Sequence, residues 1–174
     1  SYNCTYPDDI TAALLDVIER AKATDRRVIV NASISTDAVK IKPAVDACVA
    51  AGIPLICAAG NDGREMLDQY PSCFESPITV AALQADGKRA HFSTWHGEVD
   101  FTDDGIQVES IDLDGQPDKK SGTSFATPTL AGKAGLLLSA NPDMTEPELY
   151  EALKRLAVDL EGAGRDPYTG YGFV

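Results

Sequence analysis

Two short apolar segments flank a helical pattern early in the chain, and this arrangement constrains the fold more than any other feature. Residues 28–34 and 53–59 are rich in β-branched and small apolar side chains, which is typical of strands buried on both faces. Between them, apolar residues recur at helical spacing over residues 41–49, and Gly52 follows as a helix end. A strand, a helix and a second strand in this order predict a crossover between parallel neighbours, and therefore an α/β fold.

Further apolar patterns predict the elements that follow or precede this unit. A helix is expected from Pro7 up to Arg26 and Arg27, because acidic residues occupy its first turn and apolar residues then recur at helical spacing as far as Ala21. Residues 78–83 are expected to form a third core strand. A polar loop is expected over residues 116–121. Short strands separated by turns are expected at residues 90–93, 99–101 and 106–110.

The last part of the chain predicts two helices. Small and apolar residues dominate from Thr123 up to Asn141, which indicates a helix buried on most of its sides. Thr145 and Glu148 have the spacing of a capping box, and an amphipathic helix is expected directly after them. Since no repeat or linker interrupts the pattern, residues 1–174 are expected to form part of one domain.

The charge of the chain bears on its partners. There are 27 acidic and 15 basic residues among 174, which gives a net charge of −12. Such a surface repels phosphate, so neither nucleic acid nor an anionic membrane is expected as a partner. No apolar run in the sequence approaches the roughly 20 residues of a membrane span.

The four cysteines do not have the spacing of a zinc site, because no two of them form a Cys-x-x-Cys pair. Cys48 and Cys57 lie within apolar segments and are expected to be small core residues. Cys4 and Cys73 lie in polar segments, where they either stay free or form a disulfide in an oxidising compartment.

A serine precedes the apolar helix in a pattern that suits a nucleophile. Residues 121–124 read Ser-Gly-Thr-Ser, a small-residue turn that delivers Ser124 to the amino end of the helix. A hydroxyl nucleophile gains there from unpaired backbone N–H groups, which stabilise the oxyanion that its attack creates. The alternative is that this turn only caps a core helix.

An asparagine follows the second core strand. Asn61 comes directly after Ala58, Ala59 and Gly60. The active sites of open α/β sheets lie at the carboxyl ends of their strands, and a side-chain amide there can donate to an oxyanion. The alternative is that Gly-Asn only forms a turn.

Five segments, in order along the chain, resemble motifs of the subtilisin-like serine proteases, or subtilases. Residues 122–128 read Gly-Thr-Ser-Phe-Ala-Thr-Pro and match the family's Gly-Thr-Ser-x-Ala-x-Pro nucleophile motif. Residues 58–63 read Ala-Ala-Gly-Asn-Asp-Gly and match its Ala-Ala-Gly-Asn-x-Gly oxyanion loop. Residues 28–35, 89–93 and 168–172 resemble its Val-Ile-Asn-x-Ser-Leu-Gly strand, its Arg-Ala-x-Phe-Ser segment and its closing Gly-x-Gly turn. The resemblance implies a three-layer α/β fold around a mostly parallel central sheet.

The resemblance also implies roles for individual residues. Ser124 would be the nucleophile of peptide-bond hydrolysis, and Asn61 would donate to the oxyanion beside the backbone N–H of Ser124. Residues 33–35 would pair with an extended peptide as an added strand, although the family has Gly where Ser35 stands. The residues implied to bind substrate are Ser33, Ile34, Ser35, Ala58, Ala59, Gly60, Tyr70 and Thr123.

The family's catalytic Asp and His have no counterpart in the sequence. Their motifs precede the Asn and Ser motifs, so they would lie upstream of residue 1. His91 and His96 fall on positions that are not catalytic in the family and are interpreted as surface or packing residues. Recruitment of His91 as a substitute base is the alternative. We therefore expect residues 1–174 to be the C-terminal part of a catalytic domain, lacking its first strands, with Asp and His on an N-terminal segment or a companion chain.

Two functions of different classes follow from this pattern. The first is a serine endopeptidase for peptide or protein substrates, with little activity as an isolated chain, because a serine without its base is a poor nucleophile. The second is an inactive pseudoprotease that binds peptides or a protein partner along residues 33–35. A different hydrolase that uses His91 as its base is a third alternative.

The resemblance raises one cofactor, Ca²⁺, which subtilases often bind. Acidic residues cluster at residues 100–104 and 112–118. Neither segment has the spacing of an EF-hand, and the alternative is that both carry solvated surface acids. No other cofactor or metal is expected.

Overall fold

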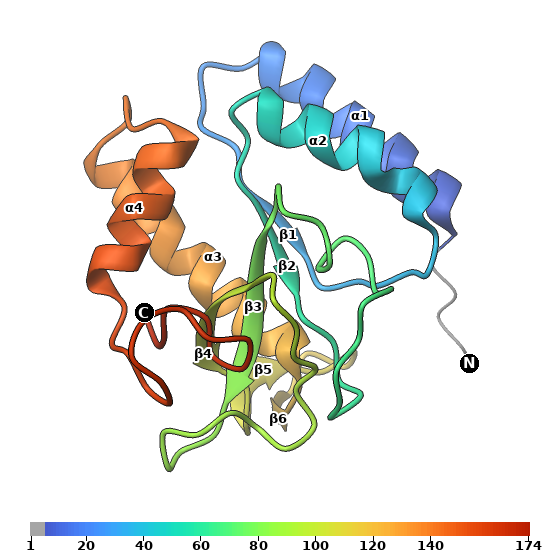
Figure 1. Ribbon diagram of the computed structural model, residues 1–174. Helices are drawn as coiled ribbons and strands as arrows, with labels where there is room; N and C mark the ends of the chain where they lie inside the picture. The colour runs from blue at the N-terminus through green and yellow to red at the C-terminus, as the bar shows by residue number, and fades with distance from the viewer. Residues whose placement is uncertain (1–5) are drawn as a thin grey trace.

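A parallel sheet of four strands forms the centre of the structure, a computed structural model that describes residues 6–174 (Figure 1). The strands lie side by side in chain order: β1 (Val30–Ala32), β2 (Leu55–Ala58), β3 (Ile78–Leu83) and β4 (Val99–Asp104). All neighbours are parallel, with Val30 beside Leu55 and Ile56 beside Ile78. The α/β class predicted from the sequence is confirmed.

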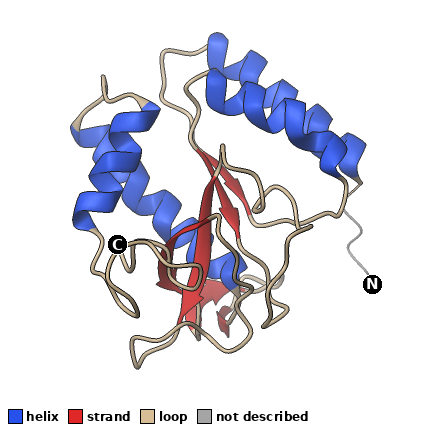
Figure 2. Cartoon of the chain, viewed as in Figure 1, coloured by secondary structure: helices blue, strands red, loops and turns tan. Residues whose placement is uncertain are grey.

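Helices cover both faces of this sheet (Figure 2). On one face lie α1 (Pro7–Lys22), the 3₁₀ turn η1 (Val39–Ile41) and α2 (Lys42–Ala50), and on the other lie α3 (Thr123–Ala140) and α4 (Glu146–Leu156). Leu55 and Cys57 of β2 pack with α1 and α2, whereas Ile56 between them packs with α3, because successive side chains of a strand point to opposite faces. None of the helices within residues 6–174 combines the length and the apolar content that a membrane crossing needs.

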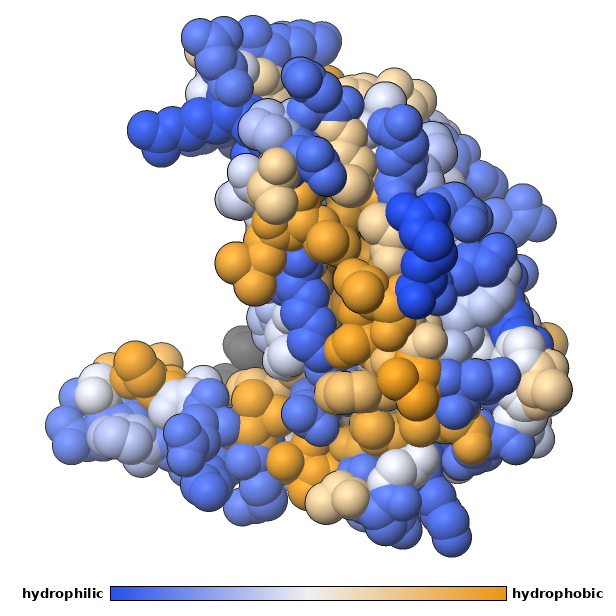
Figure 3. Space-filling model, turned by 90° about the vertical axis from the view of Figure 1, so that its left-hand side faces the viewer, coloured by the Kyte–Doolittle hydropathy of each residue, from blue (hydrophilic) through white to orange (hydrophobic). Residues whose placement is uncertain are grey.

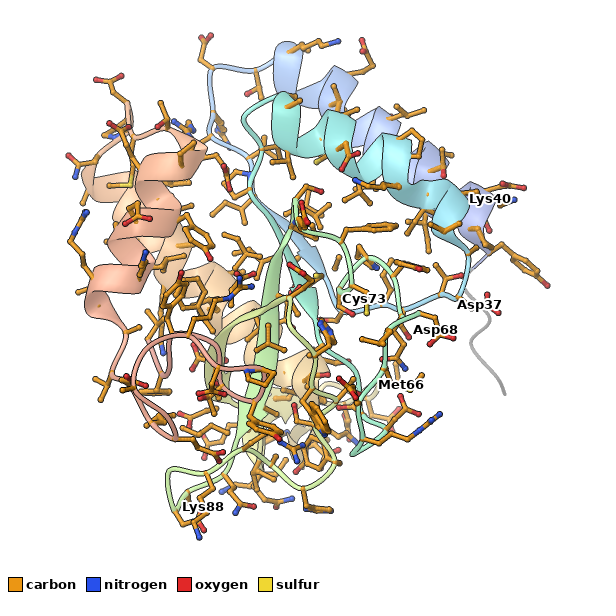
Figure 4. All side chains as sticks on the ribbon, viewed as in Figure 1. Asp37, Lys40, Met66, Asp68, Cys73 and Lys88 are labelled. Carbon is orange, nitrogen blue, oxygen red and sulfur yellow. The ribbon has the colours of Figure 1, made fainter. Side chains whose placement is uncertain are left out.

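Two of the three described cysteines, Cys48 and Cys57, follow the prediction made for them. Cys48 and Cys57 are fully buried, and burial raises the pKa of their thiols to about 11 and about 12. Cys73 is half-buried, and its Sγ donates to the carbonyl oxygen of Met66 at 3.4 Å, within the loop where Figure 4 labels both residues. Cys4, the other cysteine of the suggested pair, lies outside the described residues.

A two-stranded antiparallel hairpin, β5 (Val108–Ile111) and β6 (Pro117–Lys120), lies beside the main sheet. The prediction of a polar loop over residues 116–121 is wrong for residues 117–120, because these residues pair with β5. The turn between the strands is held by Asp112, whose Oδ1 accepts from the backbone N–H groups of Asp114 and Gln116. An exposed strand buries few side chains, so its sequence lacks the alternation of apolar and polar residues that would predict it.

Two other predicted strands also differ from the structure. Residues 90–93 form a turn, in which the backbone N–H of Ser93 donates to the carbonyl oxygen of Ala90 at 2.8 Å. The strand expected over residues 28–34 is reduced to the three residues of β1. Within residues 6–174, β1 has a neighbouring strand on one side only, which is β2. Residues 28–34 can therefore form inter-strand hydrogen bonds on that side alone, and only Val30–Ala32 pair as a strand.

A buried histidine lies next to the start of β4. His96 is 1% exposed, and its Nδ1 accepts from the backbone N–H of Glu98 at 3.2 Å. Burial, and to a lesser degree the nearby guanidinium of Arg165, lowers the pKa of His96 to about 4. The imidazole is therefore neutral in the folded protein at neutral pH, which confirms its interpretation as a packing residue.

This histidine should make stability depend on pH. Between about pH 6.5 and about pH 4 an unfolded chain binds a proton at His96 that the folded protein does not, so stability is lost as the pH falls through this range. The loss reaches about 3 kcal/mol at most. His96→Asn removes the titration and offers an oxygen to the N–H of Glu98. The difference in unfolding free energy between the original protein and this variant, measured by urea denaturation, should shrink in acid.

His91→Asn provides the matched control, because His91 is exposed. Its substitution should leave the pH dependence of unfolding unchanged. Parallel pH profiles for the original protein and His96→Asn would contradict the assignment of a neutral buried imidazole.

Candidate functional site

Ser124 lies in the first turn of α3, at the carboxyl end of the parallel sheet. Helix α3 begins at Thr123, and the residue before it, Gly122, has φ +150°, a conformation that other residues rarely adopt. Ser124 is half-buried. The first N–H groups of a helix have no partner within it, so the backbone N–H of Ser124 is available to a ligand.

Asn61 follows β2 and is bound to the start of α3. Its side-chain Oδ1 accepts from the backbone N–H of Thr123 at 2.9 Å and from the hydroxyl of Thr123 at 3.1 Å. Both bonds engage the oxygen of the amide. The Nδ2 group makes no hydrogen bond within the part of the chain that the structure describes, so it remains available as a donor.

A second contact joins α3 to the segment after β1. The hydroxyl of Ser33 donates to the carbonyl oxygen of Ser124 at 3.0 Å. The hydroxyl of Thr123 also accepts from the backbone N–H of Gly60, at 3.3 Å. Segments that follow two neighbouring strands are thereby fixed against the first turn of one helix.

These contacts surround a cavity of about 260 Å³. It brings together eight of the ten residues predicted for the site. They are Ser33, Ile34, Ser35, Ala58, Gly60, Asn61, Thr123 and Ser124. Residues from three separate parts of the chain therefore meet around one hollow, and their roles stay predictions that the geometry alone does not test.

The other two predicted residues do not line the cavity. Ala59 is fully buried and packs in the core with Ala81 and Val99. The ring of Tyr70 stacks on that of Phe74 with centroids 4.4 Å apart, and its backbone pairs with Thr36. Tyr70 thus holds the loop in place rather than contributing to the wall of the cavity.

Asp62 and Gln69 line the cavity but were not predicted to do so. The Nε2 of Gln69 donates to the carboxylate of Asp62 at 2.5 Å. Asp62 follows Asn61 directly in the oxyanion-loop motif of residues 58–63, so its place in the sequence could have predicted that it lies near the cavity. Gln69 lies in a loop without regular structure, between Asp68 and Cys73 as labelled in Figure 4, and nothing in its sequence indicates where the side chain lies.

Gly60 allows Gln69 to lie across the end of β2. Its φ is +111°, and a Cβ at this position would lie only 2.1 Å from Oε1 of Gln69. Any larger residue would displace the Gln69 side chain. Gly60 is therefore required both for the positive φ of the turn and for the close approach of the Gln69 side chain.

Neither of the two histidines lines the cavity. His96 is buried beside β4, and the exposed ring of His91 lies edge-on to Phe92, with centroids 5.3 Å apart. The residues around Ser124 thus include hydroxyls, two amides and a carboxylate, but no imidazole. They can bind and orient a carbonyl group, but no histidine among them can take a proton from Ser124.

Several carboxylates of the acidic segments considered for Ca²⁺ already have partners. Asp100 and Asp103 pair with Arg165 and Lys133, at 3.1 Å and 2.9 Å. In the second segment, Asp112 accepts from backbone N–H groups. Across residues 6–174, no cluster of three or more acidic, histidine or cysteine side chains is arranged to hold a metal ion.

Curated proteins similar to this chain are named as proteases or subtilisins. Minor extracellular protease Epr of Bacillus subtilis (strain 168) is 36% identical over 152 residues, which cover 86% of this chain and 24% of that protein. Subtilisin E of the same organism is 33% identical over 151 residues, or 84% of this chain and 39% of that protein. The matched part of the chain therefore spans 24% of the length of one relative and 39% of the other.

Solved structures agree with the sequence matches. A protein titled S41 Psychrophilic Protease has a TM-score of 0.90 at 29% identity, with 98% of this chain and 64% of that chain covered. Sphericase has a TM-score of 0.89 at 29% identity, with 97% and 63% covered. The predicted subtilisin-like architecture is thereby confirmed. The model of the subtilase family matches residues 4–172, and the chain belongs to that family.

Proposed function

We propose that this chain carries the nucleophile and the oxyanion site of a serine endopeptidase. Ser124 is the nucleophile, and Asn61 donates to the oxyanion. The observation that carries the proposal is the pair of hydrogen bonds from Thr123 to Oδ1 of Asn61, at 2.9 and 3.1 Å. They fix the amide of a residue that shares a cavity with Ser124 and leave its Nδ2 free to donate.

The chemistry is acyl transfer. Oγ of Ser124 forms a bond to the carbonyl carbon of the substrate while its proton passes to a base, and the carbonyl electron pair moves onto oxygen. This oxyanion accepts from Nδ2 of Asn61 and from the backbone N–H of Ser124. The C–N bond then breaks as the base returns the proton to the leaving amine, and water later releases the acyl group from Ser124 by the same steps.

The base comes from a segment other than those described. We propose that residues 1–174 are the C-terminal part of a catalytic domain, and that an N-terminal segment or a companion chain brings the Asp and His. The absence of a histidine from the cavity supports this. The solved relatives support it too, because this chain covers only 64% of one and 63% of the other.

The surface offers a place for such a segment. The side of the molecule that carries α3 and α4 shows a band of apolar residues bordering a hollow (Figure 3). Helix α3 is rich in leucine, alanine and glycine, yet Leu136 is 74% exposed. Strand β1 also lacks a second neighbour within the described residues, and parallel sheets are normally covered and paired.

The substrate is a peptide or protein in extended form. Residues 33–35 follow strand β1 and line the cavity together with Ala58 and Gly60, which lie at and just after the end of the neighbouring strand β2. A peptide added as a strand along residues 33–35, beyond the end of β1, would gain main-chain hydrogen bonds. Its carbonyl could then reach Ser124 at the end of the cavity.

A peptide-binding protein without catalysis is the second candidate, and the lack of an imidazole beside Ser124 favours it. The two candidates differ in what Ser124→Ala does. In a protease the substitution abolishes cleavage. In a binding protein it leaves peptide affinity unchanged and there is no cleavage to lose.

Covalent labelling tests the role of Ser124. In the complete protein, with the segment that brings Asp and His, a peptidyl phosphonate should add once to Ser124, because only this hydroxyl has both a base and an oxyanion site. Intact-mass spectrometry detects the adduct. Ser124→Ala should abolish it, whereas Ser121→Ala, three residues earlier, should keep it. Equal labelling of the Ser124→Ala variant would refute the assignment.

Substitution of Asn61 tests the oxyanion site. Asn61→Ala should lower kcat by roughly 10²–10³-fold with little change in KM, because the amide acts on the charge that develops in the transition state. Steady-state cleavage of a chromogenic peptide provides the measurement. Asn141→Ala, the same substitution at the far end of α3, is the control and should change neither constant. A loss confined to KM would assign Asn61 to substrate binding instead.

A further inference from the structure

The β5–β6 hairpin stands away from the rest of the molecule. Of residues 109–120, only Ser110 and Asp118 are half-buried, and all the others are exposed. Within residues 6–174, the hairpin pairs with no third strand. A two-stranded hairpin by itself is at best marginally stable in water, so such an arm is expected to pack against a further element.

The end of this arm is apolar. Leu113 in the turn is fully exposed, and Ile111 is 72% exposed. Ile111 lies directly opposite Pro117 across the hairpin, so their two side chains share one face. An open hollow of about 690 Å³ on the arm is lined by hairpin residues alone, Ile111 and Pro117 among them. Single exposed apolar residues are ordinary, but these three, which together form the hairpin tip, indicate a contact surface.

The base of the hairpin is bound to the residues directly before Thr123 and Ser124. The backbone N–H of Gly122 donates to the carbonyl oxygen of Gly105 at 2.8 Å. The backbone N–H of Gln107 donates to the hydroxyl of Ser121 at 2.9 Å. The arm therefore starts at the border of the candidate site, and a segment packed along it lies beside that site.

The hairpin also borders the hollow described above. It forms the arm at the lower left of Figure 3, and apolar atoms lie on the side of the arm that faces the hollow. The apolar band on the body of the molecule borders the same hollow, so one segment packed there would cover both surfaces. More than a third of each of the two solved relatives lies outside the part that matches this chain, which is enough polypeptide to do so.

We propose that the hairpin tip is a docking surface for the N-terminal segment that brings Asp and His. The inference rests on the proposed function for the existence of that segment. The segment should present apolar side chains to Ile111, Leu113 and Pro117, because removal of these residues from water is the main gain of the contact. Docking along the arm places the segment beside the loop that carries Ser124, where its base is needed.

A contact with the protein substrate is the competing interpretation, because the arm starts beside the site. A substrate would cover the tip only while it is bound, whereas the N-terminal segment covers the tip in the free protein as well. The accessibility of the tip before and after a substrate mimic binds therefore separates the two interpretations.

The experiment measures how fast a thiol at the tip reacts. Leu113→Cys is introduced into the complete protein, with the segment that brings Asp and His, and N-ethylmaleimide is added. The rate is read by mass spectrometry from the peptide that holds residue 113. A thiol covered by the segment should react at least about tenfold more slowly than an exposed one, because it reacts only when the contact opens.

Leu67→Cys supplies the matched control. Leu67 is 69% exposed, and it lies outside the hairpin, in the loop where Figure 4 labels Met66 and Asp68. Ile111→Cys provides a second position at the tip and should be protected to a similar degree. Equal rates at the tip and at residue 67 would overturn the inference, and so would protection that appears only after a peptidyl phosphonate has bound.

The same samples separate this inference from the proposed function, because burial of the tip needs no catalysis. Protection at residue 113 in a protein whose Ser124 takes up no phosphonate supports the docking surface and counts against the protease. Labelling of Ser124 in a protein whose residue 113 stays fully reactive supports the protease and overturns the docking surface.

Discussion

The hydrogen bonds between Thr123 and Asn61 join two parts of the chain that are far apart in sequence, and the site depends on them. They connect the end of strand β2 to the first residue of helix α3. Because both bonds engage the amide oxygen, the same contact that fixes the helix start also orients the amide nitrogen. A single contact therefore serves packing and the proposed oxyanion site.

The parallel sheet explains why these groups meet at all. In parallel strands every carboxyl end lies at the same edge, so residues 33–35 after β1 and residues 58–61 at and after β2 share that edge. Helix α3 packs across the sheet and brings Ser124 to it. The hydroxyl of Ser33, bound to the carbonyl of Ser124, joins the first of these segments to the helix. The fold thus provides the geometry before any ligand arrives.

Local patterns predicted the elements that bury apolar side chains and the short motifs around Ser124 and Asn61. They failed where contacts between distant segments decide the structure. Residues 117–120, predicted as part of a polar loop, form β6 by pairing with β5, and Gln69 reaches the cavity from an irregular loop. Ala59 was grouped with Ala58, although alternation along an extended chain turns the two side chains to opposite faces. That alternation was available in the sequence and could have excluded Ala59 from the cavity.

The most direct test of this account is a crystal structure of the complete protein with a peptidyl phosphonate bound to Ser124. The phosphonyl oxygen stands in for the oxyanion. We expect it to accept from Nδ2 of Asn61 and from the backbone N–H of Ser124 at about 2.7–3.1 Å, while Oδ1 of Asn61 keeps both bonds to Thr123. An adduct whose phosphonyl oxygen points into solvent, with the Asn61 amide turned away, would contradict the account.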